Sequence, residues 1–275
     1  LADSMAGLMT RVLRANAAVC PLDAEARPRT RSLRAAIARF RKVLAKGRYA
    51  VPAGFIARGE VGVTPLLGFG TRDNQLNAVI LQLIARARRR LVLFTPYFNL
   101  PGAVRRAIGK KIRQGCTVTI VVGDKTANDF YISPEEAFTP ICALPYLYEA
   151  NLRRFCSAHQ ESVDQYRLNL HLWQQAGHSF HLKGLLVDDD YALITGSNLN
   201  PRAWRLDLEN GLLLHDPESL LAAQHQAELE RVLAQTRRLA HHSQLDDVDS
   251  YPPPVKRLLR RLARTRADRL VNQVL

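Results

Sequence analysis

The chain has 275 residues, of which 47% are hydrophobic and 23% charged, and its formal net charge is +14. These values suit a soluble globular protein of one or two domains. No run of about 18 apolar residues is present, which excludes a membrane-spanning helix. The basic charge indicates a polyanionic partner, either an anionic membrane surface or nucleic acid, including the ribosome.

The first 62 residues are predicted to be mostly helical. Apolar residues recur at helical intervals over residues 1–50, with arginines on the opposite side, and Pro21 and Pro28 separate two helices. Residues 50–62 are predicted to form a loop. The chain begins at Leu1 without a methionine, which fits a processed or trimmed chain, or a start inside a longer reading frame.

From Val63 the pattern alternates between helices and strands. We predict helices over residues 74–90, from an N-cap at Asn99 to near Gly115, and over 145–155 and 217–239. The predicted strands cover residues 91–95, 117–122, 168–173, 182–187, 191–195 and 211–215. This order predicts an α/β layered domain over residues 63–240, with a mixed, largely parallel sheet flanked by helices.

Residues 241–275 are predicted to be a linker and a basic amphipathic segment. Tyr251 and the three prolines after it predict a stiff spacer. The helix expected after them carries seven basic residues and one acid, Asp268, beside an apolar stripe. Such a helix suits an anionic membrane surface, where each basic residue contributes roughly 1 kcal/mol. The alternative is an arginine-rich helix packed on its own protein.

The four cysteines, Cys20, Cys116, Cys142 and Cys156, form no C-x-x-C pair and do not lie near a histidine at zinc spacing. We therefore expect reduced, mostly buried thiols in a cytosolic protein, and neither a metal nor a cofactor.

A compact set of chemically active residues lies late in the chain. It combines an H-x-K-x-x-x-x-D spacing, a glycine-serine-asparagine turn and a following carboxylate. In chain order the members are His181, Lys183, Asp188, Gly196, Ser197, Asn198 and Glu209.

These groups suit chemistry at phosphorus. In a strand, His181 and Lys183 point to the same face. A histidine can attack phosphorus or protonate a leaving oxygen, and Lys183 and Asn198 would stabilise the non-bridging oxygens. We expect Glu209 to hold the other ring nitrogen of His181. Asp188 is expected to organise the turn after the strand more than the chemistry.

The set resembles the H-K-D motif of the phospholipase D superfamily. The superfamily usually has G-S-x-N after six residues, whereas here seven residues precede Gly196 and the turn is G-S-N. The extra residue and the missing residue cancel, so the spacing from His181 to Asn198 is kept.

Longer strings narrow the resemblance to the bacterial CDP-diacylglycerol–serine O-phosphatidyltransferases of the phospholipase D type. The similarity covers most of residues 63–275. It implies a peripheral protein on the cytoplasmic face of the membrane that converts CDP-diacylglycerol and L-serine to phosphatidylserine and CMP. The strings are VTPLLGFG (63–70), TPYFNLP (95–101), VVGDKTANDFYI (121–132), ALPYLYEANLRRF (143–155) and GSNLNPRAWRLDLEN (196–210).

The resemblance also implies a ping-pong reaction through a phosphatidyl-histidine, which needs two histidines on opposite sides of phosphorus. Only one H-K-D motif is present, because all eight histidines lie at or beyond His159. The family carries its first motif further upstream. We therefore expect residues 1–62 to be the tail and linker of a first catalytic half, supplied by a longer chain or a second subunit. His181 would then act as general acid and base.

Other interpretations stay open. The chain could be another transferase of the superfamily, such as a cardiolipin synthase, a dimeric single-motif nuclease, or an inactive half that binds lipid or nucleic acid. Asp124, Lys125, Asn128 and Asp129 are candidate substrate contacts, together with Ser197 in the glycine turn. The alternative for the 124–129 segment is a polar surface loop.

Overall fold

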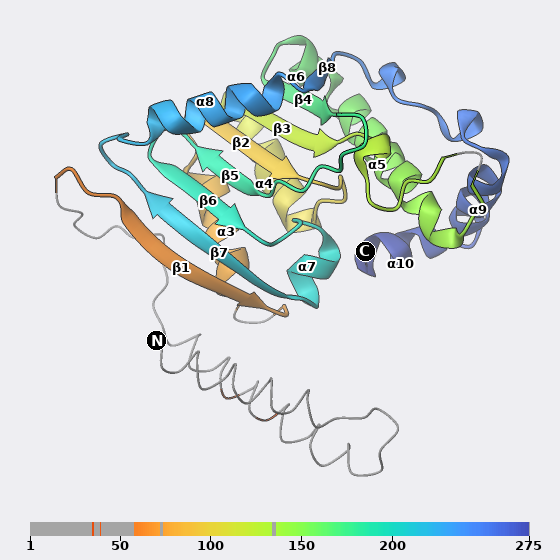
Figure 1. The fold of residues 1–275 in the computed structure, drawn as a ribbon, viewed down its shortest axis with the longest axis horizontal. Helices are drawn as coiled ribbons and strands as arrows, with labels where there is room; N and C mark the ends of the chain where they lie inside the picture. Colours follow the sequence, from red (N-terminus) through yellow and green to blue (C-terminus); the bar gives the residue numbers. More distant parts are fainter. Residues whose placement is uncertain (1–34, 36–38, 40–57, 72–73, 134–135, 275) are drawn as a thin grey trace.

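The computed structural model describes residues 35, 39, 58–71, 74–133 and 136–274 (Figure 1). The helices predicted over residues 1–50 and Cys20 lie outside this part. In the described residues an eight-stranded sheet has the order β1-β7-β6-β5-β2-β3-β4-β8. Its strands are β1 (Gly62–Phe69), β2 (Arg90–Thr95), β3 (Thr117–Gly123), β4 (Leu168–Trp173), β5 (Gly184–Val187), β6 (Tyr191–Thr195), β7 (Leu208–His215) and β8 (Thr236–Leu239).

The mixed α/β architecture is confirmed, but the sheet is not largely parallel. Only β2–β3 and β3–β4 pair in parallel, whereas the other five neighbouring pairs are antiparallel. Parallel pairing needs a crossover of about a dozen residues. The link between β5 and β6 is only residues 188–190, so these two strands form a hairpin.

Helices cover the two faces of the sheet unequally. On one face, α3 (Gln75–Arg86), α4 (Gly102–Arg113) and α5 (Leu144–Ala158) enclose the main core, which includes Ile80 and Ile108. On the other face, α8 (Ala222–Leu233) lies in front of β2, β3 and β5 in Figure 1. Its Leu229 packs with Val92, Phe94 and Val121 of β2 and β3. Alternate residues of a strand therefore enter different cores.

Two strands were missed by the sequence prediction. Residues 236–239 were expected to end a long helix, but α8 ends at Leu233 and β8 follows, paired with β4. The strand β1 contains Pro65 and Gly68, two residues that rarely signal a strand. Because β1 is an edge strand, it tolerates a proline.

The helix starts differ in how well they were predicted. The helix predicted over residues 74–90 is α3, which ends earlier, at Arg86. Asn74 is its N-cap, and the Asn74 side chain accepts from the Asn77 N–H at 2.9 Å. The N-cap predicted at Asn99 is wrong, because α4 follows Pro101 without a side-chain cap. The Asn99 amide instead donates to the Asn272 carbonyl oxygen in α10 (Ala267–Val274).

The basic helix α9 (Pro253–Arg264) packs on the protein itself. Its Val255 and Leu259 are buried in one cluster with Tyr146 and Leu147 of α5. The predicted spacer is docked too, since the Tyr251 hydroxyl donates to the Tyr146 carbonyl oxygen at 3.1 Å. The structure thus has the alternative arrangement, an arginine-rich helix held on its own protein.

Two further features concern the cysteines and the length of the apolar helices. Cys116, Cys142 and Cys156 are free and buried, as predicted for these three. No helix within the described ranges is long and apolar enough to cross a membrane.

The β5–β6 turn is held by one carboxylate. Asp188 has φ +51°, a left-handed conformation that aspartate tolerates better than most residues. Its side chain accepts from the backbone N–H groups of Arg88, Arg89 and Arg90, with shortest distances of 3.0, 2.8 and 2.9 Å. Burial acts to raise the pKa of this carboxyl, but the three backbone hydrogen bonds outweigh it and lower the pKa. These contacts agree with the expected turn-organising role.

We predict that Asp188→Ala lowers the free energy of unfolding by about 1–3 kcal/mol at neutral pH, because three backbone donors lose a charged acceptor. The folded-state pKa is depressed, so this stabilisation is present above the unfolded pKa of about 3.9 and is lost as the pH falls through the folded value. Urea denaturation at several pH values measures it. Asp189→Ala, which removes partly exposed ion pairs with Arg89 and Arg90, is the control and should cost less than about 1 kcal/mol. Equal losses in the two variants, or a loss independent of pH, would contradict the assignment.

Candidate active site

The site is built around His181, which lies on the loop that leads into β5. Its ring Nε2 lies 2.9 Å and 2.8 Å from the two carboxylate oxygens of Asp129. Asp129 follows β3, and Tyr97 follows β2. Because β2 and β3 are parallel, the loops after them lie at the same edge of the sheet. The antiparallel strand β5 starts at that edge, so three segments far apart in sequence meet there.

Asp129 is held by several donors. The Tyr97 hydroxyl donates to it at 2.6 Å, and the Tyr97 ring stacks on Tyr148 with centroids 5.4 Å apart. Burial acts to raise the pKa of the Asp129 carboxyl, but hydrogen bonds from Tyr97, His181 and Ser179 together lower it. Burial and the bond to Asp129 raise the pKa of the Tyr97 hydroxyl. Asp129 is therefore an ionised acceptor behind the imidazole.

Lys183 lies on the other side of the ring. Its Nζ is 3.4 Å from His181 Nδ1 and 2.7 Å from the His181 carbonyl oxygen. An ammonium only donates and a carboxylate only accepts. These contacts therefore assign the ring proton to Nε2, facing Asp129, and the lone pair to Nδ1, facing Lys183. Burial lowers the pKa of Lys183, and the carboxylates of Asp129 and Glu209 oppose that shift.

The expectation that Glu209 holds His181 is wrong. In the described part of the chain, the carboxylate bonded to the ring is Asp129, 52 residues before it. Glu209 instead lies beside the glycine turn, where a side-chain carbon on Gly196 would be 3.1 Å from its Oε2. Burial raises the pKa of Glu209, assisted by Asp207 and opposed by Lys183 and Arg202. Glu209 thus adds negative charge near Lys183 without orienting the imidazole.

The two polar residues of the turn differ in exposure, since Ser197 is buried and Asn198 is partly exposed. Ser197 is 0% exposed, and its Oγ accepts from the Leu199 N–H at 3.3 Å. It shapes the turn, so the predicted substrate contact by Ser197 is wrong. The Asn198 carbonyl oxygen accepts from Thr95 Oγ1 at 2.6 Å. Its side-chain Oδ1 is buried without a hydrogen-bond partner among the described residues, and such an oxygen is costly unless a ligand supplies a donor.

The loop after β3 is folded inward. Asp124 is buried, accepts from the Thr126 N–H at 3.1 Å and pairs with Arg237 at 3.4 Å. Asn128 is buried as well, and its side chain accepts from the Phe130 N–H at 3.0 Å. The alternative of a polar surface loop does not describe these two residues. Their role as substrate contacts stays a prediction.

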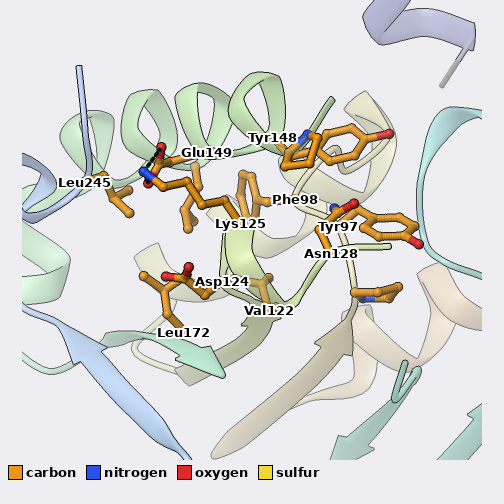
Figure 2. A pocket seen from close by; sticks show the side chains of 14 residues that line it. Tyr97, Phe98, Val122, Asp124, Lys125, Asn128, Tyr148, Glu149, Leu172 and Leu245 are labelled. Carbon is orange, nitrogen blue, oxygen red and sulfur yellow. Dashed lines mark hydrogen bonds and ion pairs between the residues drawn. The ribbon is translucent and has the colours of Figure 1, made fainter. Parts of the chain in front are cut away.

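Lys125 belongs to an ion cluster on the far side of the same loop. Its Nζ lies 3.1 Å from Glu149 and also pairs with Asp246. Figure 2 shows Lys125 and Glu149 at one end of a narrow pocket and the rings of Tyr97 and Tyr148 at the other. Lys125 is thus engaged by two carboxylates, away from the Tyr97 end that leads to His181.

Two named enzymes are similar to the chain over its whole length. It is 45% identical to the CDP-diacylglycerol–serine O-phosphatidyltransferase of Haemophilus influenzae and 44% identical to that of Escherichia coli, PssA. Each match includes 100% of this chain, but only 61% and 60% of the relatives. The chain therefore spans about three-fifths of the length of these curated relatives.

The fold of the chain is also similar to that of a solved structure. The crystal structure of phosphatidylserine synthase from H. influenzae Rd KW20 superposes with a TM-score of 0.84 at 45% identity, over 100% of this chain and 61% of that chain. A family model described as cardiolipin synthase, PLD-like domain, matches residues 80–233, which is more than half of the chain. The resemblance predicted from the H-K-D motif is confirmed, and the chain belongs to the family of phospholipase D-like domains.

Proposed function

We propose that this chain forms one part of a CDP-diacylglycerol–serine O-phosphatidyltransferase. The reaction would transfer a phosphatidyl group from CDP-diacylglycerol to L-serine and give phosphatidylserine and CMP. The observation that carries this proposal is the 45% and 44% identity, over the whole chain, to two enzymes with that name. The arrangement of His181, Lys183 and Asp129 supports it, because it suits a transfer at phosphorus.

The proposed reaction has two displacements at phosphorus. In the first, a histidine nitrogen forms a bond to phosphorus, the bond to the CMP oxygen breaks, and a general acid protonates CMP. In the second, the serine hydroxyl loses its proton to a general base, its oxygen bonds to phosphorus, and the phosphorus–nitrogen bond breaks. The two displacements use opposite sides of phosphorus, so two histidines are required.

We assign His181 the role of general acid and base. Its Nδ1 carries the lone pair that would take the proton of serine, and Asp129 stabilises the imidazolium that results. The nucleophilic histidine then belongs to the part of the longer protein that this chain does not include, or to a second subunit. In this reading residues 63–240 are one catalytic domain, and residues 1–62 link it to the other half.

The neighbouring groups stabilise charge on the phosphate. Lys183 lies 3.4 Å from Nδ1, so its ammonium would face the non-bridging oxygens of a phosphate bound there. Asn198 has a buried amide oxygen without a donor among the described residues, and a substrate hydroxyl or ammonium can supply one.

Membrane association is proposed as electrostatic. The apolar side of α9 is buried against α5, so insertion of that side into lipid would first require undocking. Several arginines of α9 face outward instead, namely Arg257, Arg260, Arg261 and Arg264. They would bind anionic head groups at the inner face of the cytoplasmic membrane, where the proposed substrate resides.

A transfer to a different acceptor is the second candidate, because the matching family model bears the name of cardiolipin synthase. Release of CMP that depends on serine, and not on phosphatidylglycerol, separates the two reactions.

We predict that His181→Ala in the full-length protein lowers serine-dependent CMP release by roughly 10²–10⁴-fold, the usual contribution of a general acid and base. Labelled CDP-diacylglycerol in mixed micelles provides the assay. His178→Ala is the matched control, since His178 is exposed in the same segment and, among the described residues, its ring hydrogen-bonds the Ala176 carbonyl oxygen and no residue of the site. Activity retained in His181→Ala would refute the assignment.

A second prediction concerns the carboxylate that replaces Glu209 as partner of the ring. Asp129→Asn should lower kcat by roughly 10²-fold and leave the KM values for both substrates nearly unchanged, because it alters the orientation and charge stabilisation of His181. Tyr97→Phe should have a smaller effect in the same direction. Tyr148→Phe is the control, since Tyr148 stacks on Tyr97 without contacting Asp129. An Asp129→Asn variant with normal kcat would show that another group orients the imidazole.

A further inference from the structure

Residues 246–274 form an arm that contacts the segments from which the candidate site is built. The arm contains α9 and α10. Figure 1 shows both helices near α5, with α10 next to α7 (Pro201–Arg205), the short helix that follows the glycine turn. The arm also contacts the loops after β2 and β3, which carry Tyr97 and Asp129. It therefore reaches three of the segments around His181.

The first contact of the arm is an ion cluster centred on Lys125, in the loop after β3. The Lys125 Nζ lies 3.1 Å from Glu149 of α5 and also pairs with Asp246 of the arm. Burial acts to lower the pKa of Lys125, but the two carboxylates outweigh it and raise the pKa. Lys125 is mostly buried, and such a charge is costly without its partners. The position of this lysine thus depends on both carboxylates.

Lys125 is connected to His181 through one short turn. It begins η1 (Lys125–Ala127), and the Ala127 carbonyl oxygen accepts from the Phe180 N–H at 3.0 Å. Phe180 directly precedes His181, and Asp129 lies two residues after Ala127. A displacement of this turn would therefore disturb both partners of the hydrogen bond between Asp129 and His181.

The second contact of the arm holds the loop after β2. The Asn99 side chain donates to the Asn272 carbonyl oxygen at 3.2 Å, and the Asn151 amide of α5 donates to the Asn272 side chain at 2.9 Å. Asn99 is buried, and its N–H donates to the Tyr97 carbonyl oxygen at 3.0 Å. Because the Tyr97 hydroxyl donates to Asp129, the arm reaches that carboxylate through both loops.

The arm has an apolar base of its own. Tyr251, Val255 and Leu259 pack with Tyr146 and Leu147 of α5, in a cluster separate from the main core. Site residues on loops are held precisely only where neighbouring groups support them. The cluster anchors the arm to α5, and the polar groups of the arm then reach the two loops.

We propose that the arm positions the Asp129 carboxylate against the imidazole of His181. It acts through Lys125 on the loop after β3 and through Asn99 on the loop after β2. A misplacement of about 1 Å can cost roughly 10²-fold in rate, so even a modest shift of the loop has a measurable effect. The catalytic part of this inference rests on the proposed function, whereas the position of the ring does not depend on the substrate.

Asp246→Asn in the full-length protein tests the inference, because it removes the charge that pairs with Lys125 and keeps the shape of the side chain. Asp247→Asn is the matched control. The Asp247 side chain is 55% exposed, against 53% for Asp246, and it pairs with Arg153 of α5 at 3.3 Å. We expect Asp246→Asn to lower the kcat of serine-dependent CMP release roughly 10-fold with unchanged KM values, and Asp247→Asn to change kcat less than about twofold.

Two further measurements separate positioning from a general loss of stability. In an Asp129→Asn background, Asp246→Asn should lower kcat less than about twofold, because the group that it positions is already altered. In protein with ¹⁵N-labelled histidine, the ring-nitrogen NMR signals of His181, assigned with His181→Ala, should shift in Asp246→Asn and remain unchanged in Asp247→Asn.

Equal kcat values for Asp246→Asn and Asp247→Asn, or an undiminished loss in the Asp129→Asn background, would overturn the inference. Unchanged His181 signals in Asp246→Asn would overturn it as well. The NMR measurement needs no turnover. Shifted His181 signals in a protein that releases no CMP with serine would therefore refute the proposed function and leave the positioning role intact.

Discussion

The position of β2 between a parallel and an antiparallel neighbour is the constraint on which the site depends. β2 pairs in parallel with β3 and antiparallel with β5. Strand direction alone then puts the end of β2, the end of β3 and the beginning of β5 at one edge of the sheet. Each contributes one member of the chain of contacts from Tyr97 through Asp129 to His181. The buried cores on both sides of β2 fix this geometry.

The electrostatics of the site follow from that arrangement. An ionised carboxylate lies behind the imidazole and an ammonium lies in front of it. The side chain of His181 is 54% exposed, so a substrate can approach its ring. A buried amide oxygen of Asn198 has no partner in the described part of the chain. This feature fits a domain that performs its chemistry beside a further part of the protein.

Much of this was predictable from the sequence, for reasons tied to particular residues. The strands over residues 168–173 and 191–195 have the predicted bounds, because their apolar patterns are strong and short. The H-K-D spacing identified His181 and Lys183 correctly as neighbours. Sequence reasoning failed where distant segments meet. It chose Glu209 as the partner of His181. The carboxylate that contacts the ring belongs instead to Asp129, in the loop after β3, and local spacing does not show that this loop lies beside His181. The direct signal for Asp129 was its place after a strand predicted to be buried and parallel.

One missed strand and one open alternative have the same origin. The apolar stripe of α9 fitted either a membrane surface or a helix packed on its own protein, and only the tertiary fold shows that α5 covers it. β8 has the sequence TRRL, which carries little strand signal without its pairing to β4. Local patterns thus predicted which residues are apolar, but they did not predict what those residues pack against.

Mapping the covalent intermediate tests the central claim most directly, namely that this chain holds one side of the phosphorus. The full-length protein would be mixed with labelled CDP-diacylglycerol in the absence of serine, quenched at alkaline pH and analysed by peptide mass spectrometry. The account predicts a phosphatidyl adduct on a histidine outside these 275 residues, formed together with one equivalent of CMP. An adduct on His181, or CMP release without any histidine adduct, would contradict it.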